Sequence, residues 1–315
     1  MHEFRFSCNV FAIRSAGSFT EYCRAAERYG YDAVFTADHL GSPAPFSPLI
    51  AAAEATQRLR VGTMVLNVGF WNAHLLAREV ATADLLTGGR LELGLGAGHM
   101  KWEFDAAGLP WRPLPERADL LEATLDELER IFGSDGYEQG QQAREFYDLP
   151  TLAPVQRRGL NGTGPPLIIG GTGDRMLRLA ARRADTVAVG GLFQVAGKPP
   201  GTFRMGTAAE ADERVRFIRD QAGERAGELE LHALIQAVVV TEDRKETARD
   251  LVEDRLPHFT PGELLETPFA LIGTVDEIAD QLRERRDRFG FSFITVHEPY
   301  METFGPVIGR LKSQS

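Results

Sequence analysis

The sequence predicts one closed (β/α)8 barrel, the TIM-barrel class, formed by the whole chain from residue 1 to residue 315. Two observations support this prediction. Runs with strand-like apolar patterns alternate with stretches of helical 3.6-residue periodicity from one end of the chain to the other. Eight such pairs occur, and eight parallel strand–helix units close into a barrel. A doubly wound open sheet is the alternative architecture, although such sheets seldom reach eight regular repeats.

The expected strands are short and bounded by turn residues: Phe4–Phe11, Ala33–Ala37, Val61–Asn67, Arg90–Leu95, Pro166–Gly170, Thr186–Gly190, Leu231–Thr241 and Phe291–His297. A helix pattern follows each strand. The clearest helix patterns cover Phe19–Tyr29, Pro48–Thr56, Leu75–Leu86, Leu114–Phe132, Asp174–Arg183 and Phe304–Leu311.

Three stretches interrupt this alternation and are expected to be insertions: 133–165, 192–205 and 256–270. All three are rich in Gly, Pro or polar residues. The first contains GYEQGQQAREFYDL, which predicts a small hairpin, and the third contains LPHFTPGELLETP, which predicts a mobile lid or a short helix. None has the length or apolar content of a separate domain.

Composition restricts the function classes. The hydrophobic fraction of 43% is sufficient for a large core, and the formal charge of -10 disfavours nucleic acid or an anionic membrane as partner. The chain contains no run of 18 apolar residues and does not begin like a secretory signal, so a cytoplasmic location is expected. Cys8 and Cys23 lie apart, without a CxxC or a His cluster, which predicts reduced thiols and no metal site. A small molecule is the expected partner.

The segment PLIIGGTGDRM carries the most specific local signal, because an apolar strand leads through a glycine-rich turn directly into a helix. Such a turn brings backbone amides close to an anion at the helix N-terminus, where phosphate binds. The spacing matches neither a Walker loop nor a dinucleotide fingerprint. An ordinary tight turn capped by Asp174 is the alternative. The candidate phosphate-binding residues are Gly170, Gly171, Thr172, Gly173, Asp174, Arg175 and Met176.

The pair Asp38-His39 ends the second expected strand. In a barrel, chemistry collects at the C-terminal ends of the strands, where a carboxylate and an imidazole can share a ligand or a proton. The alternative is that Asp38 caps the next segment and His39 packs under a loop. Gly94, Gly96 and Gly98 follow the fourth strand and would let a flat ring approach the backbone.

At this point the residues carry a resemblance. The segments GYDAVFTADHL, VGTMVLNVGFWNAHLLAREVATADLLTGGRLELGLGAGHMKWEFDAAGLPW, PPLIIGGTGDRMLRLAARRAD and IGTVDEIADQLRERRDRFG resemble the luciferase-like monooxygenase superfamily. The resemblance spans nearly the whole chain. The DH, GAGHM and GGTG motifs are more similar to the branch that uses the deazaflavin coenzyme F420 than to bacterial luciferase. It implies a bacterial luciferase-like TIM barrel with an insertion after strand four, which 133–165 matches.

The resemblance also implies roles for individual residues. Asp38 would contact the cofactor, and His39 would lie near its reacting carbon. A bulge with a non-prolyl cis peptide at Met64-Val65 would back the deazaflavin ring. The remaining residues assigned to the cofactor are Asn67, then Gly98, His99 and Met100 along the ring or ribityl chain, and the phosphate-binding segment Gly170 to Met176.

The implied chemistry is hydride transfer, for which the protein supplies orientation and a proton. We expect His39 to be the proton donor or acceptor, with Asp38 positioning it and Glu103 as a second candidate acid. Trp71 and Trp102 are the candidate walls of the substrate pocket. His99 stands where relatives often carry Trp or Glu, so the substrate remains open.

Three functions remain in contention: an F420-dependent oxidoreductase acting on a small organic substrate, an FMN-dependent monooxygenase, and a non-catalytic flavin-binding protein. Few basic residues besides Arg175 and Arg178 stand near the phosphate-binding turn, which keeps FMN as the alternative cofactor. Similar proteins are often homodimers that pack helices of the second and third units. The Ala-rich face of Pro48–Thr56 is the candidate contact, or else it covers the barrel.

Overall fold

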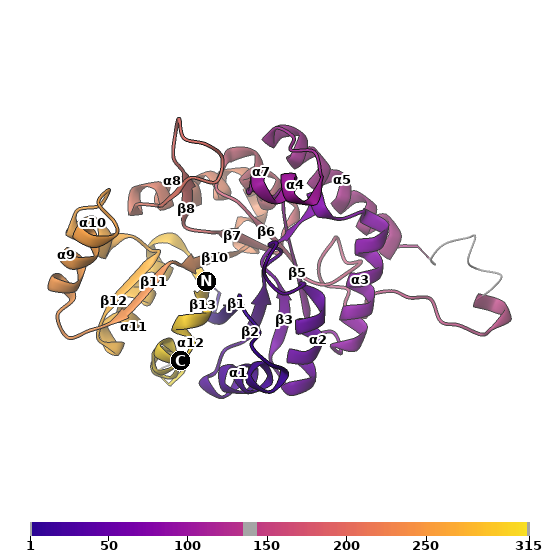
Figure 1. Ribbon diagram of the computed structural model, residues 1–315, viewed down its shortest axis with the longest axis horizontal. Coiled ribbons are helices and arrows are strands. Elements are labelled where there is room, and N and C mark those ends of the chain that lie inside the picture. Colours follow the sequence, from indigo (N-terminus) through magenta and orange to yellow (C-terminus); the bar gives the residue numbers. More distant parts are fainter. Residues whose placement is uncertain (1, 135–143, 314–315) are drawn as a thin grey trace.

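The computed structural model describes residues 2–134 and 144–313, and it contains the expected closed barrel of eight parallel strands surrounded by helices (Figure 1). Pairing of β3 with β5 completes the ring. The barrel strands are β1 (Arg5–Val10), β2 (Ala33–Thr36), β3 (Arg60–Thr63) with its continuation β4 (Leu66–Asn67), β5 (Leu91–Gly96), β6 (Leu167–Gly170), β7 (Thr186–Val189), β10 (Glu230–Ile235) and β13 (Phe291–His297). Each of the eight predicted strands therefore has a counterpart in the barrel, although one of them extends beyond it.

Helices form the outer layer and follow the strands as the periodicity predicts. They are α1 (Ala16–Tyr29), α2 (Phe46–Ala55), α3 (Ala73–Leu86), α4 (Lys101–Ala107), α5 (Leu114–Phe132), α7 (Asp174–Arg183), α8 (Ala208–Ala222), α9 (Arg244–Asp254), α10 (Pro261–Glu266), α11 (Val275–Phe289) and α12 (Met301–Lys312). Short 3-10 turns lie at Val68–Phe70, Gly223–Gly227 and Glu298–Tyr300. No helix in the described part of the chain is long and apolar enough to cross a membrane.

Several helices begin at a side chain that satisfies their free amides. Ser15, Thr207, Thr260 and Thr274 each form a capping box with the residue three positions on. Such caps stabilise a helix by about 1 kcal/mol and fix its first residue. Single residues in the sequence therefore determine where these helices begin.

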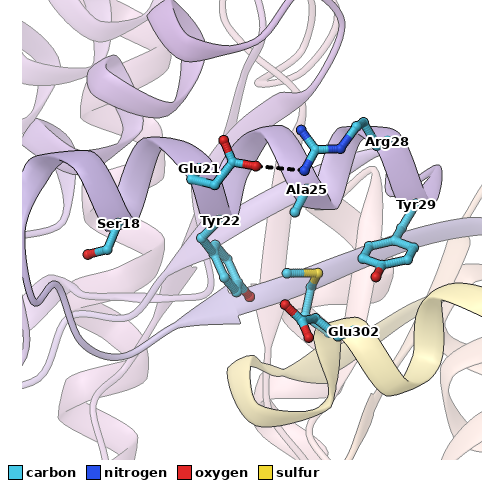
Figure 2. Close-up of a pocket in the computed structure, with 8 residues that line it drawn as sticks. Ser18, Glu21, Tyr22, Ala25, Arg28, Tyr29 and Glu302 are labelled. Atoms are coloured by element: carbon cyan, nitrogen blue, oxygen red, sulfur yellow. Dashed lines mark hydrogen bonds and ion pairs between the residues drawn. The ribbon is translucent and has the colours of Figure 1, made fainter.

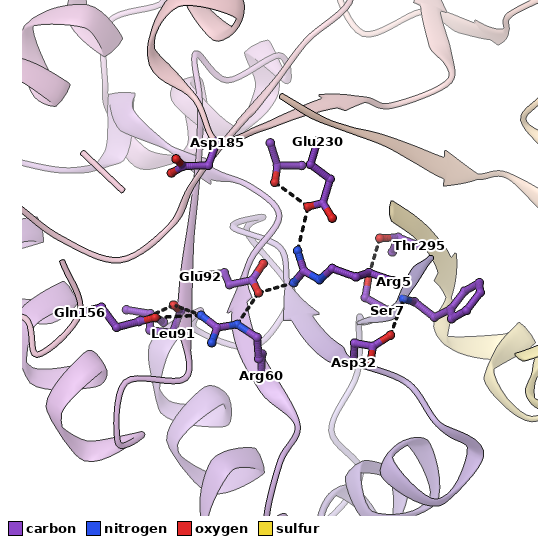
Figure 3. A network of polar contacts seen from close by, with 12 residues as sticks. Arg5, Ser7, Asp32, Arg60, Leu91, Glu92, Gln156, Asp185, Glu230 and Thr295 are labelled. Atoms are coloured by element: carbon purple, nitrogen blue, oxygen red, sulfur yellow. Dashed lines mark hydrogen bonds and ion pairs between the residues drawn. The ribbon is translucent and has the colours of Figure 1, made fainter. Parts of the chain in front are cut away.

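The N-terminal end of the barrel is filled by an ion network (Figure 3). Glu92, only 2% exposed, pairs with both Arg5 and Arg60, and Arg5 also pairs with Glu230 at 2.7 Å. Arg60 reaches Gln156 at 3.0 Å, which ties the end of the 133–165 insertion to the barrel floor. In this fold the N-terminal face serves stability and the opposite face carries the chemistry.

Three expectations about the segments between the barrel units need correction or completion. The predicted strand Leu231–Thr241 is two strands, because after β10 the chain leaves the barrel and β11 (Ala237–Val240) pairs with the unpredicted β12 (Ala270–Gly273). Together with α9 and α10 this pair forms a lobe beside the barrel, at the left of Figure 1. The insertion 192–205 forms an antiparallel hairpin of β8 (Leu192–Gln194) and β9 (Phe203–Met205).

The segment 256–270 contains the short helix α10, as one of the two expectations had it. Its buried Leu264 and Phe269 pack into the lobe, and Thr267 donates a hydrogen bond to the Gly206 carbonyl at 2.6 Å. These contacts describe a packed element rather than a mobile lid. Most of the hairpin predicted within 133–165 lies outside the described residues, and the described Arg144–Phe146 is helical.

Candidate active site

The C-terminal ends of the strands bring together side chains from turns that are far apart in sequence. A groove of about 610 Å³ lies elsewhere, on the outer layer between α1 and α12 (Figure 2). Glu21 and Arg28 form an exposed ion pair on it. Because barrel enzymes carry their chemistry at the strand ends, we assign the site by its titratable groups rather than by cavity size.

A histidine and a buried carboxylate form the centre of the site. The His39 Nδ1 atom lies 2.9 Å from Glu103 Oε1, which also accepts the backbone amide of Leu40 at 3.1 Å. The Glu103 side chain is 2% exposed and the His39 side chain is 33% exposed. A carboxylate at Nδ1 fixes the imidazole tautomer with its proton on that nitrogen, so that Nε2 is left for proton transfer.

Asp38 makes a different set of contacts from those expected. Its Oδ2 atom accepts the indole N–H of Trp71 at 2.9 Å and the backbone amide of Asn67 at 3.1 Å. Burial raises the pKa of Asp38, and these two hydrogen bonds oppose that shift. The expectation that Asp38 positions His39 is therefore wrong: Glu103 holds the imidazole, and Asp38 joins the turn after β2 to β4.

The two candidate pocket tryptophans differ in their surroundings. Trp71 is partly buried, with its ring 5.6 Å from Phe46 in an edge-to-face contact and its N–H on Asp38. Trp102, on α4, is 55% exposed. The first is thus built into the mouth of the barrel. A direct contact of either with substrate stays a prediction.

His99 connects the site to the β8–β9 hairpin. Its ring packs edge-to-face on His39 and on Phe203, with both centroid distances at 5.4 Å. Burial is the main cause that lowers the pKa of His99, which keeps this imidazole neutral near pH 7. A Cβ built on Gly201 would lie 3.4 Å from the Met100 sulfur, so the hairpin also covers the turn after β5.

The β3–β4 junction contains the expected cis peptide at Met64-Val65. The glycines of β5 leave room for this junction: a Cβ on Gly94 would meet the Thr63 carbonyl, and one on Gly96 would meet Val65 at 2.7 Å. A Cβ on Gly98 would collide with the Asn67 side chain. A direct approach of a flat ring to these three glycines stays a prediction. They admit the neighbouring chain segment, which places Met64 on the interior side of the barrel.

The glycine-rich turn after β6 leads into α7 as predicted, with Gly173 as N-cap and no side chain capping the first amides. The Gly171 amide is already used, because it donates to the Ala188 carbonyl at 3.1 Å. Asp174 is ion-paired with Arg214 of α8, and Arg175 with Asp119 of α5. The sequence did not reveal Arg214, which contributes the positive charge at this turn from 40 residues away.

Two further groups at the mouth were not predicted. The Gln236 amide nitrogen donates to the Gly190 carbonyl at 2.7 Å, and its oxygen lies 3.3 Å from His297 Nε2. Arg117 of α5 donates to the carbonyls of Ala97 and Gly98 and so fixes the turn that carries His99. His297 ends an expected strand, and that position was its one sequence signal. Arg117 gave none.

Known proteins resemble this chain in sequence and in fold. A model of the luciferase-like monooxygenase family matches residues 4–259. An F420-dependent glucose-6-phosphate dehydrogenase of Nakamurella multipartita is 29% identical over 313 residues, covering 87% of this chain and 84% of that protein.

Two solved structures share the architecture. The coenzyme F420-dependent tetrahydromethanopterin reductase of Methanopyrus kandleri superimposes with a TM-score of 0.70 at 19% identity, covering 98% of both chains. The oxygenating constituent of 3,6-diketocamphane monooxygenase from Pseudomonas putida, in complex with FMN, gives a TM-score of 0.70 at 16% identity, covering 99% of this chain and 96% of that one. At these identities the likeness establishes the fold alone.

Proposed function

Because the chain belongs to the luciferase-like monooxygenase family, whose members are enzymes, we propose that it is an oxidoreductase that uses coenzyme F420 to transfer hydride to or from a small organic substrate. The observation that carries the proposal is the His39–Glu103 pair at the mouth of the barrel. An imidazole oriented by a buried carboxylate is suited to moving one proton alongside a hydride. The F420-dependent relative, which this chain matches over most of its length, supports the choice of cofactor.

The residues at the mouth fit a deazaflavin with a phosphate-bearing tail. The uncapped amides at the start of α7 provide hydrogen-bond donors for the phosphate, and Arg214 balances the Asp174 carboxylate beside them. Within residues 2–134 and 144–313 the buried side-chain nitrogen of Asn67 has no hydrogen-bond partner, which leaves a donor for a ring carbonyl. Met64 and Val65 would back the ring, with Gly98, His99 and Met100 along its edge.

Within this site each protein group has a separate task. When bound, the deazaflavin accepts or supplies a hydride at one ring carbon. His39 gives or takes the accompanying proton at Nε2, while Glu103 holds Nδ1–H and stabilises the charged imidazolium. Asp38 and Trp71 hold the β2 and β4 turns together, and the β8–β9 hairpin over His99 limits the access of water.

An anaerobic fluorescence titration with F420 and, separately, with FMN tests the cofactor assignment. We expect micromolar or tighter binding of F420 and much weaker binding of FMN. A protein that passes would then be screened for F420 reduction with alcohols and for oxidation of reduced F420 with enones and imines. Preference for FMN would overturn the assignment.

The second candidate is an FMN-dependent monooxygenase. The FMN-bound structural neighbour and the ion-paired state of Arg175 and Arg214 favour it, because a short phosphate tail needs fewer free cations. It predicts oxygen consumption with reduced FMN. A flavin-binding protein without turnover is less favoured, since such a protein has no use for an oriented His39.

We also infer a cytoplasmic homodimer. Leu75, Leu85 and Leu86 of α3 are each more than half exposed, which supports a contact through the third βα unit. The Ala-rich face of α2 is not available for it, because Ala52 and Ala53 are buried against the barrel. Sedimentation velocity of the wild type and of Leu85→Glu would show whether α3 carries the contact.

A further inference from the structure

A groove of about 190 Å³ lies between α5 and α7 on the outside of the barrel. Its lining residues are Ala118, Glu122, Arg175, Arg178, Leu179 and Arg182. The three arginines share one face of α7, since they follow one another at spacings of three and four residues. Arg175 stands in the first turn, beside the glycine-rich turn at Gly170–Gly173, so the groove begins where the proposed phosphate site ends.

The arginines around this groove fall into two groups. Arg175, Arg183 and Arg214 are each ion-paired with a carboxylate. Arg178 instead donates through Nε to the neutral side chain of Gln221 at 2.9 Å. Among the residues that the structure describes, neither Arg178 nor Arg182 has a carboxylate partner.

These two neighbouring guanidinium groups give the groove a local positive charge in a chain that is acidic as a whole, with 45 Asp and Glu against 35 Lys and Arg. Part of their placement has a local reason: Arg182 lies in the last turn of α7, where the helix dipole favours a cation. That reason does not apply to Arg178, in the middle of the helix. Arg178 therefore remains available to an external anion.

We propose that this groove receives the glutamate tail of F420, whose carboxylates pair with Arg178 and Arg182 after the phosphate has bound at the start of α7. The proposal rests on the proposed function. Arg175 and Arg182 are about 10 Å apart along the helix, at 1.5 Å per residue. A tail of a few glutamates covers that length. The Glu122 carboxylate in the same groove opposes the tail, and so does Asp119 through its hold on Arg175.

The test compares three ligands: the deazaflavin fragment without phosphate or glutamates, F420 with two glutamates, and F420 with five or more. The last two differ only in the length of the glutamate tail. Their dissociation constants are measured by fluorescence quenching at low and at high salt. The variants are Arg178→Gln/Arg182→Gln, Glu122→Gln, and the control Lys245→Gln/Arg249→Gln, which removes two exposed charges from α9.

In the wild type we expect the long-tailed form to bind about tenfold more tightly than the two-glutamate form at low salt, with less difference at high salt, because exposed ion pairs are weak and screened. The Arg178→Gln/Arg182→Gln protein should lose that difference while its affinity for the tailless fragment is unchanged. Glu122→Gln should bind the long-tailed form more tightly. The α9 control should behave like the wild type.

Two outcomes separate the groove from the function on which it rests. Tight binding of every F420 form with no effect of tail length, or an effect that persists in Arg178→Gln/Arg182→Gln, would overturn the groove and leave the cofactor assignment standing. Failure of all three deazaflavins to bind would overturn both.

Discussion

At the scale of single residues, the decisive arrangement is a partly exposed imidazole held by an almost fully buried carboxylate. Glu103 accepts both from the Leu40 amide and at His39 Nδ1, so its two contacts lock the ring in one orientation. A carboxylate behind a histidine selects the tautomer of the ring. The other ring nitrogen, Nε2, is then the position at which a proton would leave or enter.

Replacing the imidazole should separate chemistry from binding. For His39→Ala we expect turnover to fall by about 10² to 10⁴, the usual contribution of a positioned acid or base. The dissociation constant of F420 should change little, because we place the deazaflavin ring on the β3–β4 junction rather than on His39. Steady-state kinetics and fluorescence titration measure the two quantities. Loss of binding in place of turnover would contradict a proton-transfer role.

Replacing the carboxylate should act through the histidine. Glu103→Gln keeps a hydrogen-bond acceptor at the same place but removes the charge that stabilises imidazolium. We expect a smaller loss of turnover than in His39→Ala, with the dissociation constant of F420 unchanged, because the imidazole stays in place but loses the carboxylate that orients it. A loss of turnover as large as in His39→Ala, or weaker binding of F420, would contradict a role limited to orienting the imidazole.

At the scale of elements, the fold of the site depends on how closely β5 approaches the β3–β4 junction. Gly94, Gly96 and Gly98 leave room for the carbonyl of Thr63 and for the side chains of Val65 and Asn67. The glycine pattern is thus required by the close packing of β5 on the β3–β4 junction.

Gly96→Ala tests this dependence. The new methyl group would lie 2.7 Å from Val65 Cγ2, so the β3–β4 junction must move away. We expect cofactor affinity to fall at least tenfold, while the protein stays folded by circular dichroism. Gly262→Ala is the matched control, because its Cβ would meet nothing within 4 Å. Equal affinity in the two variants would show that the junction tolerates the displacement.

The extent to which sequence predicted these elements follows from locality. Strand and helix patterns are local, as are the turn at Gly170–Gly173 and the position of Asp38-His39, and all were found. The His39–Glu103 contact joins residues 64 positions apart, and Arg214 reaches Asp174 across 40. Periodicity contains no information on such pairs. The sequence did not reveal the break between β10 and β11, because both strands are apolar. The two strands differ in the neighbouring strands with which they pair.

At the scale of the whole molecule, the two ends of the barrel have opposite characters. The N-terminal end is closed by the network of Arg5, Arg60, Glu92 and Glu230, while the opposite end carries the His39–Glu103 pair. Stability and activity should therefore respond to different substitutions.

Glu92→Gln should destabilise without inactivating. It removes the central charge of a buried network and leaves Arg5 and Arg60 short of a partner, which costs about 3 to 5 kcal/mol. Urea unfolding measures the loss, and F420 binding should be unchanged below the transition. Glu21→Gln, at an exposed pair with Arg28, should change the free energy of unfolding far less. A similar loss of unfolding free energy in both variants would show that the buried network does not stabilise the barrel more than an exposed ion pair does.

Stability should also fall on mild acidification. Burial lowers the pKa of His232 to about 3, whereas the unfolded chain takes up that proton near pH 6.5. The unfolded state therefore binds more protons below pH 6.5, and the free energy of unfolding decreases as pH falls toward 3. Between pH 7 and pH 5 the wild type should lose about 2 kcal/mol more than His232→Leu. Glu230, whose pKa burial raises, titrates in both proteins and cancels. Parallel pH profiles would contradict this account.

The closed floor of the barrel has a consequence for the order of events. In the part of the chain that the structure describes, charged and aromatic side chains fill the N-terminal half of the barrel. Small molecules would therefore enter and leave through the mouth, under the β8–β9 hairpin. Because the barrel has one opening, the molecule that binds deepest must enter first and leave last. The order of binding and release is thus set by the shape of the barrel, whatever the affinities.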